Sequence, residues 1–152
     1  MTDQNLSAED RLEVMDLIAR YSRCLDTADV EGFLEIFRPE AVIDSLSGVA
    51  TGHDELRAWV NRLFDSRGVG ATPPAVIHFV GLPLIEGYGD RARAQTYTII
   101  LDYNAAGLVQ VAMLGRYDDE CVRVDGRWWI QRRVIHSELS NDPAASTVAP
   151  TT

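Results

Sequence analysis

The sequence predicts a single α+β domain in which N-terminal helices pack on one face of a curved antiparallel sheet. The spacing of apolar residues changes from three or four positions in the first half of the chain to two positions from residue 75 onward. The connections between the later segments are short and rich in Gly, Asn and Asp, as in antiparallel hairpins. The chain has 152 residues, 46% of them hydrophobic, which suffices for one core without disulfides or a structural metal.

The first helix is expected at residues 8 to 27. Ser7 is its predicted N-cap, and the carboxylate of Asp10 favours the positive end of the helix. The side chains of its predicted buried face recur at steps of three and four residues, and they are Leu12, Met15, Ile18, Tyr21, Ser22 and Leu25. This pattern indicates a helix with one face against the sheet.

Two further helices and a short hairpin are expected before the long strands. Asp29 is the predicted cap of a short second helix that Pro39 ends, and Asp54 is the predicted cap of a third. The apolar positions of the third helix are Leu56, Val60, Leu63 and Phe64. Between these two helices, residues 41–44 are expected to form a strand, with residues 48–51 returning beside it.

The second half of the chain is expected to form four long strands after a loop at residues 68–74. The strands cover residues 75–85, 91–103, 108–124 and 128–137. The last residues are mainly Ser, Thr, Pro and Ala, which leaves little to bury. We therefore expect a domain over residues 1–139 and a disordered tail over residues 140–152.

The charge balance and the cysteines exclude several classes of partner and cofactor. The chain has 14 Lys and Arg against 23 Asp and Glu, which disfavours nucleic acid and anionic membrane surfaces because both require a basic face. Cys24 and Cys121 have no second ligand at metal-binding spacing, so no metal site or disulfide is indicated. No segment has the pattern of a signal peptide or a membrane span, so we expect a cytoplasmic protein with a small-molecule partner.

Two ionisable residues in apolar surroundings are the first candidates for a functional site. Asp26 lies near the end of the first helix, next to the buried Leu25, where a carboxylate needs a partner. His78 lies in the middle of an apolar strand, with Val76 and Val80 on the same face. If the two side chains meet, the carboxylate would fix the imidazole tautomer and make His78 a positioned general base. The alternatives are a helix-capping role for Asp26 and a hydrogen-bonded core histidine at position 78.

The order of these elements, together with several short motifs, resembles the SnoaL-like branch of the NTF2-like superfamily. The motifs are Tyr21, Asp26, Phe33, Phe37, residues 41–44, Gly52, residues 78–81, residues 89–92, residues 115–117 and residues 125–128. The resemblance implies an NTF2-like cone, in which a bent sheet wraps a long helix and encloses a deep, mostly apolar pocket. It also implies that the pocket binds a small hydrophobic molecule.

Asp26 and His78 are similar to the Asp/His dyad of three lyase families on this fold, scytalone dehydratase, bile-acid 7α-dehydratase and hexachlorocyclohexane dehydrochlorinase. In these families the histidine removes a proton and a group on the neighbouring carbon departs. The bile-acid enzymes resemble this chain most, and their pattern implies further site residues at Tyr21, Asp102 and Arg133. Arg132 and Arg133 are neighbours on a predicted strand, so their side chains point to opposite faces of the sheet, and which of the two points inward is left open.

The chain also departs from related site patterns. Leu25, Ser45 and Asp102 stand where scytalone dehydratases have two tyrosines and a second histidine, which disfavours a scytalone-type substrate. Ser45 also stands where the ketosteroid isomerases of this superfamily have their general-base aspartate. Isomerase chemistry of that form is therefore not expected.

The resulting hypothesis is a cofactor-independent, metal-free lyase of the dehydratase type that acts on a small hydrophobic or polycyclic substrate. His78 would take a proton from carbon, Asp26 would orient the imidazole, and Tyr21 would donate a hydrogen bond to the developing oxyanion. Asp102 and Arg133 would assist the departing hydroxyl.

Two alternatives use the same pocket. One is a polyketide-type cyclase or hydroxylase, and the other is a non-catalytic module that binds a small ligand. In either case Trp129, Ile99 and Leu101 are expected on the outer face of the sheet, where they would support a homo-oligomer, either a dimer or a trimer.

Overall fold

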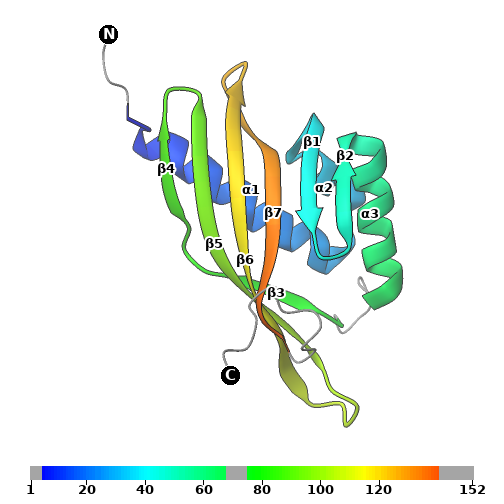
Figure 1. The fold of residues 1–152 in the computed structure, drawn as a ribbon. Helices are drawn as coiled ribbons and strands as arrows, with labels where there is room; N and C mark the ends of the chain where they lie inside the picture. The colour runs from blue at the N-terminus through cyan, green and yellow to red at the C-terminus, as the bar shows by residue number, and fades with distance from the viewer. Residues whose placement is uncertain (1–4, 68–74, 141–152) are drawn as a thin grey trace, which may run out of the picture.

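The computed structural model describes residues 5–67 and 75–140, and it confirms the α+β class with a sheet that curves around a long helix (Figure 1). The helices are α1 (Ala8–Thr27), α2 (Val30–Leu34) and α3 (Gly52–Arg67). The strands are β1 (Phe37–Ser45), β2 (Gly48–Thr51), β3 (Ile77–Val80), β4 (Leu84–Tyr88), β5 (Arg91–Tyr103), β6 (Val109–Val124) and β7 (Arg127–Ser140). The predicted loop at 68–74 and residues 141–152 of the predicted tail lie outside the described residues, whereas Ser140 is the last residue of β7.

The strands form one sheet in the order β2-β1-β7-β6-β5-β3, and β4 pairs with β5 as well. Helix α1 crosses the face of the sheet behind β4 to β7, and α3 lies beside β2 (Figure 1). The β1–β7 pair is parallel, whereas we expected an entirely antiparallel sheet. Because α3 and five strands separate β1 from β7 in the sequence, no hairpin turn fixes their relative direction.

Helix α1 carries part of the site, and its boundaries are those that the sequence predicts. The Ser7 side chain accepts a hydrogen bond from the Asp10 backbone N–H at 3.0 Å, and the Asp10 carboxylate accepts one from the Ser7 N–H at 3.1 Å. These two bonds form a capping box. At the other end, Ala28 adopts the left-handed conformation with a φ of 56°, which terminates the helix.

Three local predictions for the helices are corrected by the structure. Leu12 is 64% exposed, and the neighbouring Val14 faces the core instead. Pro39 does not end α2, because that helix stops at Leu34 and Pro39 lies within β1. Asp54 lies in the first turn of α3 and not at its cap, because the helix already begins at Gly52.

The segment predicted as one strand over residues 75–85 is two strands, β3 and β4, which both pair with β5. Pro83 lies between them and has no N–H to donate to a continuous ladder, which accounts for the break. The break assigns the two strands to opposite ends of α1. His78 of β3 contacts Asp26 near the C-terminal end, whereas Ile85 of β4 accepts a hydrogen bond from Arg11 near the N-terminal end.

The core lies between the three helices and the concave face of the sheet. A group of aromatic rings joins α1, α2, α3, β1 and β6, with centroid separations between 5.1 and 6.1 Å. Its members are Tyr21, Phe33, Phe37, Trp59 and Tyr117. Cys24 and Cys121 are free, buried thiols, as the sequence predicts. None of the described helices is long and apolar enough to cross a membrane.

The outer face of the sheet is less exposed at the predicted oligomer positions than we expected. Trp129, Ile99 and Leu101 are all half-buried. The guanidinium carbon of Arg127 lies 3.9 Å from the centre of the Trp129 ring, so a cation covers part of this indole. Phe79 is the more open apolar side chain, with 65% of its surface exposed. Homo-oligomerisation stays a prediction.

Candidate active site

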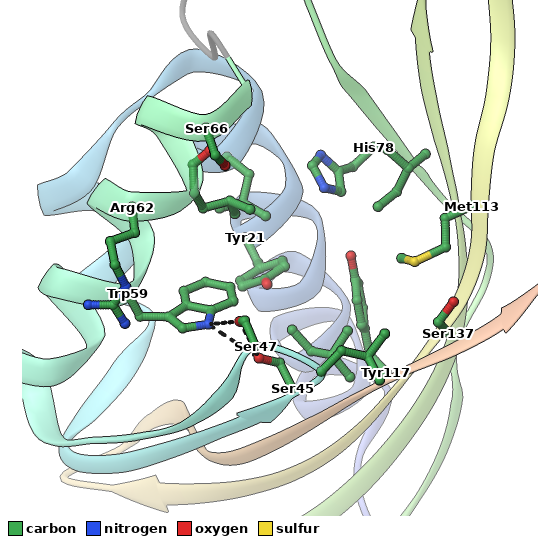
Figure 2. A pocket seen from close by; sticks show the side chains of 15 residues that line it. Tyr21, Ser45, Ser47, Trp59, Arg62, Ser66, His78, Met113, Tyr117 and Ser137 are labelled. Carbon is green, nitrogen blue, oxygen red and sulfur yellow. Dashed lines mark hydrogen bonds between the residues drawn. The ribbon is translucent and has the colours of Figure 1, made fainter. Parts of the chain in front are cut away.

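A cavity of about 410 Å³ lies between α1, α3 and the concave face of the sheet. This volume is within the range of roughly 300–1,000 Å³ that is usual for small-molecule sites. Leu25, Leu63, Ile100, Met113 and Ile135 provide apolar wall. The polar groups on the wall, all labelled in Figure 2, come from Tyr21, Ser45, Ser47, Trp59, Arg62, Ser66, His78, Tyr117 and Ser137. The cavity therefore suits a mainly apolar molecule with a few polar groups.

Asp26 and His78 form a hydrogen-bonded pair at one side of this cavity. The Asp26 Oδ1 and His78 Nδ1 atoms are 2.7 Å apart, and the side chains are 10% and 4% exposed, respectively. The backbone N–H of His78 donates to the same carboxylate, at 3.1 and 3.2 Å from its two oxygens. The carboxylate thus holds both the ring and the strand that carries it.

This geometry determines which imidazole nitrogen is available for chemistry. An ionised carboxylate only accepts hydrogen bonds, so the short contact places the ring proton on Nδ1. The lone pair is then on Nε2. His78 lines the cavity whereas Asp26 does not, so the carboxylate supports the imidazole from behind. The arrangement can position a general base against a bound molecule.

Tyr21 lies on the same helix as Asp26 and also lines the cavity. Its side chain is 1% exposed, and its ring packs edge-on against Tyr117 with the centroids 5.4 Å apart. Burial raises the pKa of the Tyr21 hydroxyl well above its usual range. The hydroxyl therefore keeps its proton and can donate a hydrogen bond at any physiological pH.

Arg133, and not Arg132, is the arginine that points inward, but it does not line the cavity. Its side chain is fully buried and donates two hydrogen bonds to Asp119, at 2.6 and 2.7 Å. The guanidinium carbon lies 3.9 Å from the ring centre of Tyr21 and 4.3 Å from that of Tyr117. Since both rings line the cavity, they separate the cation from it. The expected contact of Arg133 with a departing hydroxyl is not supported.

Asp102 does not line the cavity either. It lies near the end of β5 and accepts a hydrogen bond from the Gln110 side chain at 2.9 Å across the β5–β6 hairpin. Ile100 is the last residue of β5 on the cavity wall, and the pairing with β6 shifts register directly after it. The hairpin then extends beyond the body of the domain (Figure 1). The expected role of Asp102 is therefore not supported by its position.

Comparison with known proteins agrees with this architecture. The SnoaL-like domain family matches residues 6–134, which is most of the chain. This chain belongs to the SnoaL-like family. Uncharacterised proteins of Mycobacterium tuberculosis and Mycobacterium bovis are 28% identical to it over 128 residues, which cover 82% of this chain and 83% of theirs.

Solved structures share the fold of this SnoaL-like chain. A protein of unknown function with a cystatin-like fold from Nostoc punctiforme is 26% identical, covers 95% of this chain and all (100%) of its own, and has a TM-score of 0.80. A Novosphingobium aromaticivorans protein provisionally named a scytalone dehydratase is 17% identical, with coverages of 95% and 96% and a TM-score of 0.75. At that identity the second likeness shows the fold alone.

Two important residues of this SnoaL-like domain were not among the sequence candidates, Tyr117 and Asp119 on β6. Asp119 lies within the acidic run Asp118, Asp119 and Glu120, which has the composition of a solvent-exposed segment, and Tyr117 directly precedes this run. The signal that could have identified them is the period of two along β6, because Tyr117, Asp119 and Cys121 all point inward and are buried. Among the described residues, no group of three or more His, Cys, Asp or Glu could hold a metal ion.

Proposed function

We propose that this SnoaL-like domain is a cofactor-independent lyase of the dehydratase type that acts on a small hydrophobic or polycyclic substrate. The observation that carries the proposal is the largely buried hydrogen bond between His78 and Asp26, with the imidazole on the wall of an apolar cavity. A buried carboxylate aimed at Nδ1 is the arrangement that orients a histidine base and stabilises it when it takes up a proton.

The reaction is a β-elimination. Nε2 of His78 takes a proton from a carbon next to a carbonyl group, and the electron pair of that C–H bond forms a C=C bond as hydroxide leaves the neighbouring carbon. The proton on the imidazolium then joins the hydroxide, and water is released. Since Asp102 and Arg133 do not line the cavity, His78 supplies this proton as well. Such general acid–base catalysis contributes about 10²–10⁴ in rate.

Tyr21 stabilises the negative charge that develops on the carbonyl oxygen. Its hydroxyl stays protonated because the surrounding core disfavours the phenolate. A donor that is fixed before the reaction strengthens its hydrogen bond as the oxyanion forms, which lowers the barrier. The Novosphingobium neighbour with a scytalone dehydratase name is compatible with elimination chemistry on this fold, although only the fold is shared at this level of identity.

Turnover of a panel of polycyclic β-hydroxy ketones, followed by the absorbance of the conjugated enone product, tests the proposal. His78→Gln and Asp26→Asn are each expected to lower kcat about 10²–10⁴-fold. His136→Gln is the matched control, because His136 is hydrogen-bonded to Asp118 at 2.8 Å and does not line the cavity. Its kcat should equal that of the wild type.

Three outcomes would contradict the elimination mechanism. Retention of most activity in both His78→Gln and Asp26→Asn would remove the pair from the chemistry. Binding of the whole panel without turnover would favour the non-catalytic ligand-binding module. Formation of a ring or a hydroxylated product from the same compounds would favour the cyclase or hydroxylase alternative.

A further inference from the structure

Tyr117 is a second buried tyrosine on the cavity wall, and the elimination described above gives it no role. It comes from β6, opposite α1, and its side chain is 2% exposed. Figure 2 shows its hydroxyl directed into the cavity, toward the imidazole of His78, with the ring of Tyr21 beside it. Two phenol groups from different elements thus line the cavity that His78 also lines.

The two tyrosine rings share a cation on their side away from the cavity. The guanidinium of Arg133 stacks on both rings, at 3.9 Å from the centre of Tyr21 and 4.3 Å from that of Tyr117. Asp119 holds the guanidinium with two hydrogen bonds in a site where both side chains are fully buried. A cation on the face of a phenol ring withdraws electron density from it, which makes the hydroxyl a stronger hydrogen-bond donor.

We propose that Tyr117 is a catalytic residue that donates, together with Tyr21, to one oxygen of the ligand, so that the cavity recognises planar oxyanions such as enolates and phenolates. This inference deepens the proposed function and rests on it for the identity of the oxygen, which is the carbonyl oxygen of the substrate. Two donors from α1 and β6 fix that oxygen in two directions, and the carbon next to it then lies within reach of His78.

A matched pair of ligands separates oxyanion recognition from simple packing. The pair is 4-nitro-1-naphthol, which is ionised in mildly alkaline solution, and 1-nitronaphthalene, which has the same frame without the oxygen. The dissociation constant of each is measured by the quenching of tryptophan fluorescence in the full chain, and the absorbance of the naphtholate reports its ionisation when bound.

The expected result is a selective loss. Tyr117→Phe and Tyr21→Phe should each weaken naphtholate binding about 10- to 100-fold, the size expected for one hydrogen bond to a charged group. Binding of 1-nitronaphthalene should change little, because phenylalanine keeps the ring on which Arg133 stacks. The variant with both substitutions should lose the preference for the naphtholate. Tyr97→Phe is the control, since Tyr97 is 55% exposed and does not line the cavity.

Equal changes in the two dissociation constants for Tyr117→Phe would reduce the residue to a packing role and overturn the proposal. A wild-type protein that binds the naphtholate no more tightly than 1-nitronaphthalene would also overturn it. Repeating the titrations in His78→Gln separates this result from the fate of the elimination mechanism. Loss of turnover tests the base, whereas the ratio of the two dissociation constants tests the pair of hydroxyl groups and needs no turnover.

Discussion

Two carboxylates of this domain, the largely buried Asp26 and the fully buried Asp119, have opposite relations to the cavity. Asp26 holds His78, whose imidazole lines the cavity and can gain or lose a proton. Asp119 holds Arg133, whose charge is permanent and which two tyrosine rings separate from the cavity. Aspartate side chains therefore serve two different purposes in this domain. A titratable partner at a cavity wall suits chemistry, whereas a permanent cation in a closed site suits the support of neighbouring rings.

Among the variants that test this contrast, a substitution of Asp119 is expected to have the largest effect, which is a loss of folding stability. Asp119→Asn leaves the guanidinium of Arg133 buried without a counter-charge, and we expect the free energy of unfolding to fall by about 3–5 kcal/mol. Urea denaturation followed by circular dichroism measures this. Replacing both partners, Asp119→Leu with Arg133→Met, should recover most of the loss because no charge is then buried. If Asp119→Asn alone were as stable as the wild type, the ion pair of Asp119 and Arg133 would not be needed for folding stability.

Asp26→Asn should give the reverse pattern, with a small effect on stability. The amide oxygen can still accept the backbone N–H of His78, so the expected loss in free energy of unfolding is about 1 kcal/mol. The amide N–H, however, favours the imidazole tautomer with its proton on Nε2, and the base is lost. Urea denaturation of this variant beside Asp119→Asn checks the contrast. If Asp26→Asn and Asp119→Asn were destabilised equally, the role of Asp26 would be structural.

Asp10 is a third buried carboxylate, and it extends the comparison because the hydrogen-bond donors to its oxygens include neutral groups. The Trp128 indole donates to it at 2.9 Å and the Ser7 hydroxyl at 2.7 Å, and these bonds lower its pKa from the ordinary value of 3.8. A pKa lowered in the folded state gives stability that is present above the unfolded pKa and is lost as the pH falls through the folded pKa.

Asp10→Asn should therefore flatten the acid limb of the stability curve. Between neutral pH and the pKa range of ordinary carboxylates, wild type and variant should differ by a constant amount, and the difference should shrink on further acidification. Urea midpoints measured at a series of pH values test this. Parallel curves down to the lowest pH would mean that the contacts of Asp10 do not depend on its charge.

Much of the fold follows from local patterns in the sequence. The capping box at Ser7 and Asp10 and the periodic face of α1 are signals within a few residues, and so is the change to a period of two in β5 to β7. We expected Asp26 and His78 to meet for two reasons. Both are polar residues in apolar surroundings, and the chain resembles a family in which such a pair occurs. The structure places them 2.7 Å apart, while their catalytic role stays a prediction.

The remaining features depend on contacts that no local pattern encodes. Asp102 misses the cavity because the pairing of β5 with β6 shifts register just before it. Arg133 is enclosed because Asp119, 14 positions earlier on the neighbouring strand, turns inward from an acidic run. The break between β3 and β4 depends on a single proline, Pro83, within a segment whose alternating apolar residues otherwise indicate one continuous strand. Strand register and side-chain partners are properties of the assembled sheet.

The parallel pairing of β1 with β7 has a consequence for how the domain is made. Ile43 of β1 lies beside Arg133 of β7, so the middle of the sheet joins segments from opposite ends of the chain. During synthesis β1 and β2 emerge long before their neighbour exists, and pairing over so large a separation is slow. The hollow that holds His78 therefore closes only after the last strand has left the ribosome, and a nascent chain has no binding site until then.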